Sequence, residues 1–378
     1  MSIGTVLVIV LCNMSSFRAS KVLVTLFGIE LGASQFAIGT MIAMYALLPA
    51  LLAMYAGKLS DRVGVRVPML VGSLGLTAGL LLPWLAPGLP ALYASAALIG
   101  ASNMFYNVSV QNLVGSLGGP EERTRNFSNY ALAMAIGSFL GPLAAGFSID
   151  AIGHAASYLY AAALPLVPVV IMASVRKVGR GPRVKTEDEQ ALLSTSLLAL
   201  PALRRTLIAS AVAVTAQDLF QFYMPIYGHS VGLSASAIGV VLAMAGIAAF
   251  VVRIGLPEFV KRFGPDAVFN GSLLVSAVAF TVFPLFTGAF ALAAIALVLG
   301  LGMGCAQPVT LTMIFSRAPE GRSGEALGMR VTINQLTHIA VPVVFGTIGS
   351  MFGVAPVFVS NALFLAGGAM LNRARKTH

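Results

Sequence analysis

The segment Gly-Ala-Ser-Gln-Phe-Ala-Ile-Gly at residues 32–39 returns 200 positions later as Gly-Leu-Ser-Ala-Ser-Ala-Ile-Gly at residues 232–239. Further identical pairs keep this offset. They are Met44 with Met244, Arg62 with Arg262, Gly64 with Gly264, Pro142 with Pro342, Gly146 with Gly346 and Gly153 with Gly353. Chance would supply a few such matches, but not a run of them in one register. We infer that the chain is an internal duplication whose two halves share a fold.

The composition indicates that lipid is the solvent for most of the chain. Of 378 residues, 58% are hydrophobic and 10% are charged, whereas soluble domains carry about 25% charged residues. Apolar stretches of 18 or more residues are typical of membrane-spanning helices. The sequence therefore predicts an all-α membrane protein with twelve transmembrane helices. The predicted spans are residues 4–29, 35–56, 67–86, 90–116, 126–149, 154–175, 206–228, 235–256, 267–287, 290–315, 326–350 and 354–372.

The basic residues alternate between connections. The segments 30–34, 87–89, 229–234 and 288–289 carry almost no Lys or Arg, whereas the other connections and the carboxyl end carry nearly all of them. Because Lys and Arg accumulate in cytoplasmic loops, both termini are predicted to be cytoplasmic. The net charge of +10 thus reflects membrane topology, and no nucleic-acid partner is expected. The short loops favour a bacterial inner membrane.

The long polar stretch at residues 176–205 divides the chain. We expect an N-terminal six-helix bundle over residues 1–175, a cytoplasmic linker over 176–205 and a C-terminal six-helix bundle over 206–378. Parallel six-helix repeats are the architecture of facilitator-type transporters, which place the substrate site near the membrane midplane between the halves.

The stretch Gly57-Lys58-Leu59-Ser60-Asp61-Arg62-Val63-Gly64-Val65-Arg66 resembles the signature between helices two and three of the major facilitator superfamily. The repeat copy, Pro257 to Gly264, has Lys261 in place of Asp61. The resemblance implies a secondary transporter that works by alternating access, as a monomer embedded in the lipid bilayer.

This motif has the composition of a gating latch. Gly57 and Gly64 allow tight helix ends, and Asp61 can lie at the positive end of a helix in the other half. Arg62 and Arg66 can hold acidic groups or lipid phosphates. The alternative is an ordinary basic loop.

The stretch Gly137-Ser-Phe-Leu-Gly141-Pro142-Leu-Ala-Ala145-Gly146 resembles the Gly-Pro motif of the family's antiporters, which include drug exporters. Glycines four residues apart permit close helix contact, and Pro142 loosens the helix. Ser128 and Ala145 stand where that motif has glycine. The match favours a gating role and export over a plain helix contact. Span 90–116 lacks the arginine that proton-coupled drug antiporters carry there.

Four charged residues lie well inside the predicted spans: Arg18, Lys21, Asp218 and Arg330. A charge at a helix centre costs about 2.5–3.5 kcal/mol to insert, so such residues are functional candidates. Arg18 and Lys21 share one helix face, and Asp218 occupies the repeat position of Arg18. These two side chains are predicted to face each other across a cavity, either as a structural pair or as a switch. The excess of cations predicts an anionic substrate.

Neutral polar residues recur at helical spacing in the same spans, and each is either a substrate contact or an interhelical hydrogen bond. Asp218 and His338 are the candidate proton carriers. The candidate substrate-binding residues are Arg18, Lys21, Asn103, Tyr106, Asn107, Gln111, Gln217, Asp218, Gln221, Gln307, Arg330, Asn334 and His338, with Thr310 beside Gln307.

The sequence thus predicts a secondary transporter for a small organic anion or anionic amphiphile, driven by exchange or by protons, with export favoured. It shows no phosphate-binding loop, catalytic pair or metal cluster, so no ATP-driven or enzymatic activity, cofactor or metal is expected. One alternative is a multidrug/H+ antiporter for lipophilic compounds, and the other is a membrane receptor that does not transport.

Overall fold

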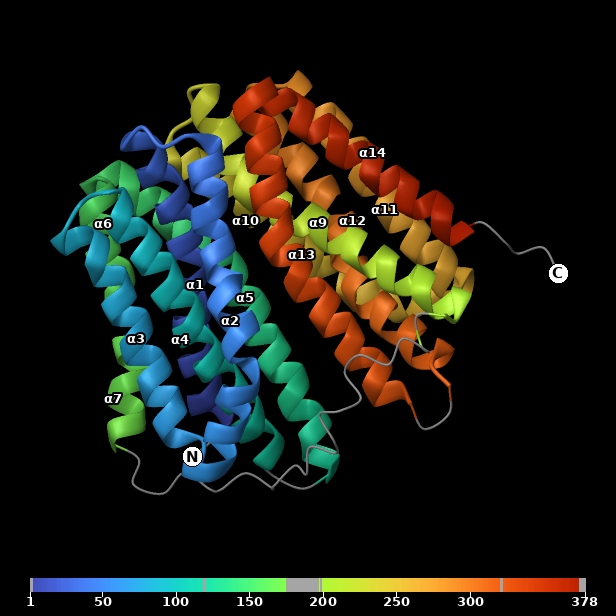
Figure 1. The fold of residues 1–378 in the computed structure, drawn as a ribbon, viewed down its shortest axis with the longest axis horizontal. Helices are drawn as coiled ribbons and strands as arrows, with labels where there is room; N and C mark the ends of the chain where they lie inside the picture. Colours follow the sequence, from blue (N-terminus) through green and yellow to red (C-terminus); the bar gives the residue numbers. More distant parts are fainter. Residues whose placement is uncertain (1–2, 118–119, 175–196, 198, 320–321, 374–378) are drawn as a thin grey trace.

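The computed structural model describes residues 3–117, 120–174, 197, 199–319 and 322–373, and every secondary-structure element in these ranges is helical (Figure 1). The first half contains α1 (Ile3–Glu30), α2 (Gln35–Val63), α3 (Arg66–Leu85), α4 (Leu89–Ser116), α5 (Pro120–Ile152), α6 (His154–Ala163) and α7 (Leu166–Ser174). The second half contains α9 (Pro201–Ser230), α10 (Ala235–Phe263), α11 (Pro265–Val282), the 3-10 helix η2 (Phe283–Leu285), α12 (Ala289–Arg317), α13 (Ser323–Phe352) and α14 (Val354–Arg373).

Each predicted span corresponds to one helix or to two consecutive helices. The sixth span is interrupted between α6 and α7, where Pro165 has no N–H to continue the helix. The ninth span ends in η2, which contains Pro284, for the same reason. α9 begins at Pro201, inside the predicted linker, because proline is well suited to the first turn of a helix.

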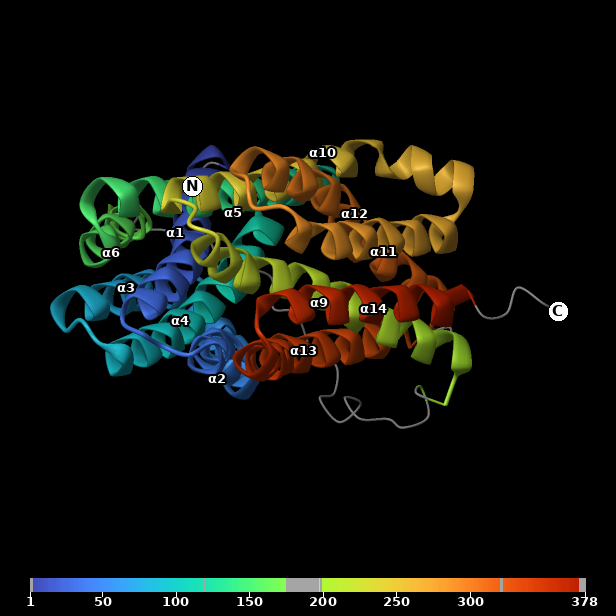
Figure 2. The same cartoon turned by 90° about the horizontal axis from the view of Figure 1, so that it is seen from above.

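Ten helices or helix pairs of the described chain are long and apolar enough to cross a membrane. The described apolar part of α2, Gln35–Leu51, is shorter. α4 is 28 residues long but is not among the ten, since Asn103 and the following amides lower its hydropathy. The protein is therefore a multi-pass membrane protein of two helical bundles, α1–α7 and α9–α14 (Figures 1 and 2).

The repeated octapeptide builds the same turn in both halves. Gly32 and Gly232 adopt φ of 76° and 80°, a left-handed conformation that glycine enters without strain. Two residues later, the hydroxyls of Ser34 and Ser234 accept hydrogen bonds of 3.2 Å from the backbone N–H groups three residues on. Each serine thereby caps the next helix, α2 or α10.

The two bundles meet along two seams, between α2 and α13 and between α5 and α10. Both seams lie at the end of the molecule that carries the octapeptide turns, which we call the closed end. The bundles diverge toward the opposite, open end (Figure 1). At the seams, a Cβ added to Gly39 would lie 2.2 Å from the carbonyl oxygen of Pro342, and one added to Gly239 would lie 2.6 Å from that of Pro142. Glycine is therefore required at both repeat-related positions.

Each seam also carries a hydrogen bond from the start of a helix in one bundle to a side chain of the other. The carboxylate of Asp150 accepts from the N–H groups of Ala235 (3.0 Å) and Ser236 (2.8 Å) in the first turn of α10. At the repeat-related position, the hydroxyl of Ser350 accepts from the N–H of Phe36 in α2 at 2.8 Å. The closed end is thus fixed by a charged cap at one seam and a neutral cap at the other.

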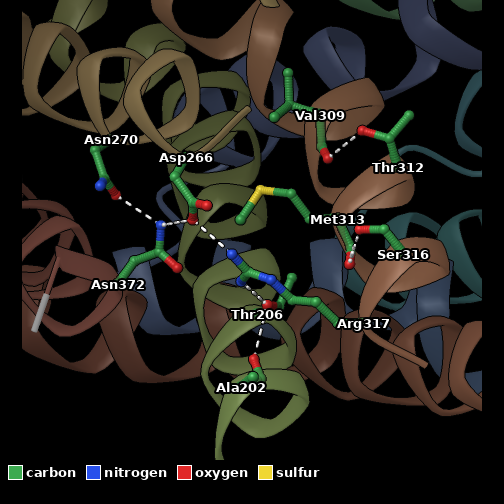
Figure 3. A network of polar contacts seen from close by, with 10 residues as sticks. All are labelled: Ala202, Thr206, Asp266, Asn270, Val309, Thr312, Met313, Ser316, Arg317 and Asn372. Carbon is green, nitrogen blue, oxygen red and sulfur yellow. Dashed lines mark hydrogen bonds and ion pairs between the residues drawn. The ribbon is translucent and has the colours of Figure 1, made fainter. Parts of the chain in front are cut away.

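A polar network joins four helices of the second bundle near its open end (Figure 3). Arg317 of α12 donates to Asp266 of α11 at 2.6 Å and to Thr206 of α9 at 2.5 Å. Asn372 of α14 donates to Asp266 at 3.2 Å. These contacts hold the second bundle together as a unit.

Arg66, at the repeat position of Asp266, joins the corresponding helices of the first bundle by different contacts. It donates to the backbone carbonyls of Met172 and Ala173 at the end of α7, both at 3.0 Å. A cation is favourable at a helix C-terminus. The prediction that Arg66 holds acidic groups or lipid phosphates stays a prediction, and the contacts found are to backbone carbonyls.

Candidate functional site

A cavity of about 320 Å³ lies between the bundles, and we call it the central cavity. Its wall is formed by α1, α2, α4, α9 and α13, so both repeats contribute. The volume is at the lower end of the range for small-molecule sites. Of the predicted site residues, the structure brings eight to this wall: Arg18, Lys21, Asn103, Asn107, Gln217, Asp218, Gln221 and His338.

The two cations of α1 enter this cavity without a carboxylate partner. Arg18 donates from Nη1 to Oε1 of Gln221 at 2.7 Å, and its buried Nε has no hydrogen-bond partner. Lys21 Nζ lies 5.5 Å from the ring centroid of Phe17 and 5.6 Å from that of Tyr45, which are cation–π distances. Among the described residues, no carboxylate oxygen lies within 4.0 Å of either cation.

The carboxylate of Asp218 is occupied by a histidine of its own bundle. Its Oδ2 and Nδ1 of His338 form a hydrogen bond between α9 and α13. The side chain of Asp218 is 12% exposed and that of His338 is 35% exposed, so the carboxylate is the more buried member of the pair. Arg18 and Asp218 do reach the same cavity, as the repeat predicts, but they do not form the predicted pair.

The remaining candidates lie outside the central cavity. Tyr106 is buried in the first bundle. A Cβ added to Gly72 would lie 2.8 Å from the Cβ of Tyr106. Gln111 is exposed. Thr310 donates to carbonyls of its own helix, those of Ala306 and Gln307. None of these lines the cavity walls found in the described chain.

Arg330 belongs to a separate buried polar cluster. It donates to Ser210 at 3.1 Å and to Gln307 at 2.6 Å, and Ser210 donates to Asn334 at 3.4 Å. The cluster joins α9, α12 and α13 and lines neither cavity. Its geometry therefore corresponds to the alternative interpretation, a polar contact between helices.

A second cavity lies beside the first, between α5 and α10, and we call it the lateral cavity. Arg18 and Lys21 line both cavities, and Arg253 of α10 lines only the lateral one. Arg253 donates from Nε to the carbonyl oxygen of Gly304 at 3.2 Å. Arg253 is a charged residue inside the predicted span 235–256, just as Arg330 is inside its own span. The sequence could therefore have identified Arg253 as a candidate by the same criterion.

The Gly-Pro motif of α5 contacts two helices at once. A Cβ on Gly137 would lie 2.9 Å from Cβ of Met14, and one on Gly141 would lie 2.4 Å from the carbonyl oxygen of Ser15, so these glycines allow α1 to approach. The carbonyl oxygen of Pro142 faces α10 across the seam. The motif therefore links the helix that carries Arg18 to the contact between bundles.

The latch motif is described only in part. α2 continues to Val63, so Gly57 lies inside the helix. The prediction that Gly57 forms a helix end is therefore wrong. Gly64 ends the helix with φ of 77°, as predicted. The side chains of Asp61 and Arg62 lie outside the described residues.

Two repeat-related helical bundles, joined at one end and separated at the other around a charged cavity, define a membrane transporter. The family model of the Major Facilitator Superfamily matches residues 6–342 and 258–376, and the chain belongs to this superfamily.

The curated relatives and solved structures are transporters. The chain is 21% identical over 343 residues to the quinolone resistance protein NorA of Staphylococcus aureus (strain MSSA476), covering 89% of this chain and 87% of that protein. It is 23% identical over 366 residues to the multidrug efflux pump LfrA of Mycolicibacterium smegmatis, covering 82% and 72%. The crystal structure of the nucleoside transporter NupG has the same fold, with a TM-score of 0.81, 14% identity and 100% of both chains covered. The chain is thus a transporter and not an enzyme.

Proposed function

We propose that this transporter exports a small organic anion or anionic amphiphile across a bacterial inner membrane. One observation carries the proposal. Arg18 and Lys21 line the central cavity, and Asp218, the carboxylate among its described lining residues, is bonded to His338. Buried cations that lack an ion pair are costly, and a bound anion supplies one.

We place the open end and both termini in the cytoplasm. The connections rich in Lys and Arg lie at the open end, and Lys and Arg favour the cytoplasmic side. The cavity then receives its substrate from the cytoplasm in this conformation. For release, the seams at Gly39 and Gly239 separate while the open end closes. A single chain supplies both bundles, so we propose a monomer as the working unit.

The membrane potential favours this direction for an anion. Moving one charge through the potential is worth about 2.3 kcal/mol per 100 mV, and the cytoplasm is the negative side. The pair of Asp218 and His338 is the proposed proton site. Adding a proton to the pair makes the cavity more positive and therefore strengthens anion binding.

Thermal shift on the purified protein tests the substrate class. The panel contains monocarboxylates, phosphate esters and lipophilic cationic drugs, applied to wild type, Arg18→Gln and Arg330→Gln. The last variant is the matched control, because it removes an embedded cation outside both cavities. An anion at 100 times its Kd should add about 2.7 kcal/mol of stability. This gain should disappear in Arg18→Gln and persist in Arg330→Gln. Stabilisation by cationic drugs alone overturns the proposal.

A second candidate function is multidrug efflux of lipophilic compounds. It is favoured by the names of the relatives, a quinolone resistance protein and a multidrug efflux pump. Its distinguishing result is drug efflux from cells that is unchanged by Arg18→Gln.

A further inference from the structure

The lateral cavity differs from the central cavity in charge. Arg18, Lys21 and Arg253 line it, and no Asp or Glu is present among its described lining residues. The central cavity has Asp218 to offset part of its positive charge, whereas the lateral cavity has no such group in the described chain. The lateral cavity is therefore the more strongly cationic of the two.

The lateral cavity, of about 90 Å³, receives Arg18 and Lys21 from α1 and Arg253 from α10, together with apolar residues. Leu242, Ala249 and Phe250 of α10 form an apolar wall at helical spacing, and Phe220 of α9 adds to it. Arg253 follows on the same helix toward the open end. From Leu242 to Arg253 the helix rises by about 16 Å, at 1.5 Å per residue.

Both guanidinium groups retain unused donors. Arg18 leaves Nε buried without a partner. Arg253 uses Nε on a backbone carbonyl, and its terminal nitrogens form no hydrogen bond within the described chain. A guanidinium group can bind a carboxylate through two parallel hydrogen bonds. Arg18 uses Nη1 on Gln221 and Arg253 uses Nε on Gly304, so each arginine keeps other donors for an anionic group.

We propose that the lateral cavity binds an organic dianion, with one negative group at Arg18, the second at Arg253 and an apolar segment along α10 between them. This inference rests on the proposed function and narrows its substrate class. Arg18 lies on the wall shared by the cavities, so the first group is accessible from the central path. The second group requires Arg253, which the central cavity does not include.

The test compares straight-chain dicarboxylates with monocarboxylates of equal length, from four to twelve carbons. Kd is measured by calorimetry on the intact transporter in nanodiscs. The second carboxylate should lower Kd by about tenfold or more at the best length, as expected for a hydrogen bond between charged groups. Arg253→Gln should remove this advantage. Lys261→Gln is the matched control, since it removes one exposed cation from the same helix and should leave the advantage intact.

A second pair of variants fills one cavity at a time. Ala249→Leu narrows the lateral cavity, and Ala46→Leu narrows the central one. Ala249→Leu should abolish the dependence of Kd on chain length while a short monocarboxylate still binds. This pair keeps the test valid if Arg253→Gln fails to fold.

The outcomes separate the two proposals. Equal Kd values for dicarboxylates and monocarboxylates, with binding still lost in Arg18→Gln, overturn the dianion site and leave anion transport standing. An advantage that survives Arg253→Gln overturns the dianion site as well. If no carboxylate binds, a dicarboxylate ligand is overturned, and if phosphate esters also fail to bind, both proposals are overturned.

Discussion

Gly39→Ala should prevent the closed end from closing. The new Cβ would lie 2.2 Å from the carbonyl oxygen of Pro342, whereas real Cβ contacts essentially never fall below 3.0 Å. α2 and α13 must therefore separate by at least about 0.8 Å at this point. Overpacking of this kind costs about 1–3 kcal/mol. The cost falls on the conformation with a closed seam, so the outward-open population should rise by about 5–150-fold.

Labelling of one cysteine measures this change. Ile42 lines the central cavity and is 8% exposed, so Ile42→Cys is placed in a variant without Cys12 and Cys305. A membrane-impermeant maleimide applied to the outside of cells should label it faster when Gly39→Ala is present. The control is Gly271→Ala, a helix position whose added Cβ meets nothing within 4 Å.

Equal labelling rates in Gly39→Ala and Gly271→Ala would refute the reasoning. A rise that also appears with the reagent on the cytoplasmic side would show general loosening of the fold, and would refute it too.

Three further predictions concern the caps and the cavity. Asp150→Ala should raise external labelling by about fivefold, from the loss of about 1 kcal/mol of helix capping. Ser350→Ala should raise it less, and the reverse order would contradict the charged cap. His338→Gln should abolish the pH dependence of the Kd of a bound anion; a persisting pH dependence would exclude this residue as the proton site. Tyr45→Leu should weaken anion binding by about two- to fivefold, because Lys21 loses a cation–π contact worth about 0.5–1 kcal/mol. Tyr45→Phe keeps the ring and should retain the affinity, and equal losses in both variants would contradict the contact.

The fold was predictable because duplication and hydropathy are local properties of the sequence. The offset of 200 residues relates Gly39 to Gly239 and Pro142 to Pro342, and these four positions form the two seams. The sequence did not predict the helix break at Pro165. A proline inside a span either kinks the helix or ends it, depending on its neighbours.

The site was predictable in its residue types but not in its pairings. The repeat places Asp218 opposite Arg18, yet Arg18 is hydrogen-bonded to Gln221 and Asp218 to His338. Rotation and tilt follow from contacts between helices, which the spacing of polar residues does not encode. For the same reason, Arg330 lies in a polar cluster and does not line the cavity, although His338 of the same helix does.

The two seams have a consequence for how such a transporter can be altered. Their closest contacts set backbone carbonyl oxygens against glycine Cα atoms, with no long side chain between them. The two prolines of these contacts, Pro142 and Pro342, also line the cavities, whereas Asn103 and Gln217 line them from α4 and α9, outside the seam helices. Replacing Asn103 or Gln217 on the cavity wall should change what is carried without altering how the bundles meet. Selectivity can diverge by single substitutions while the motion stays the same.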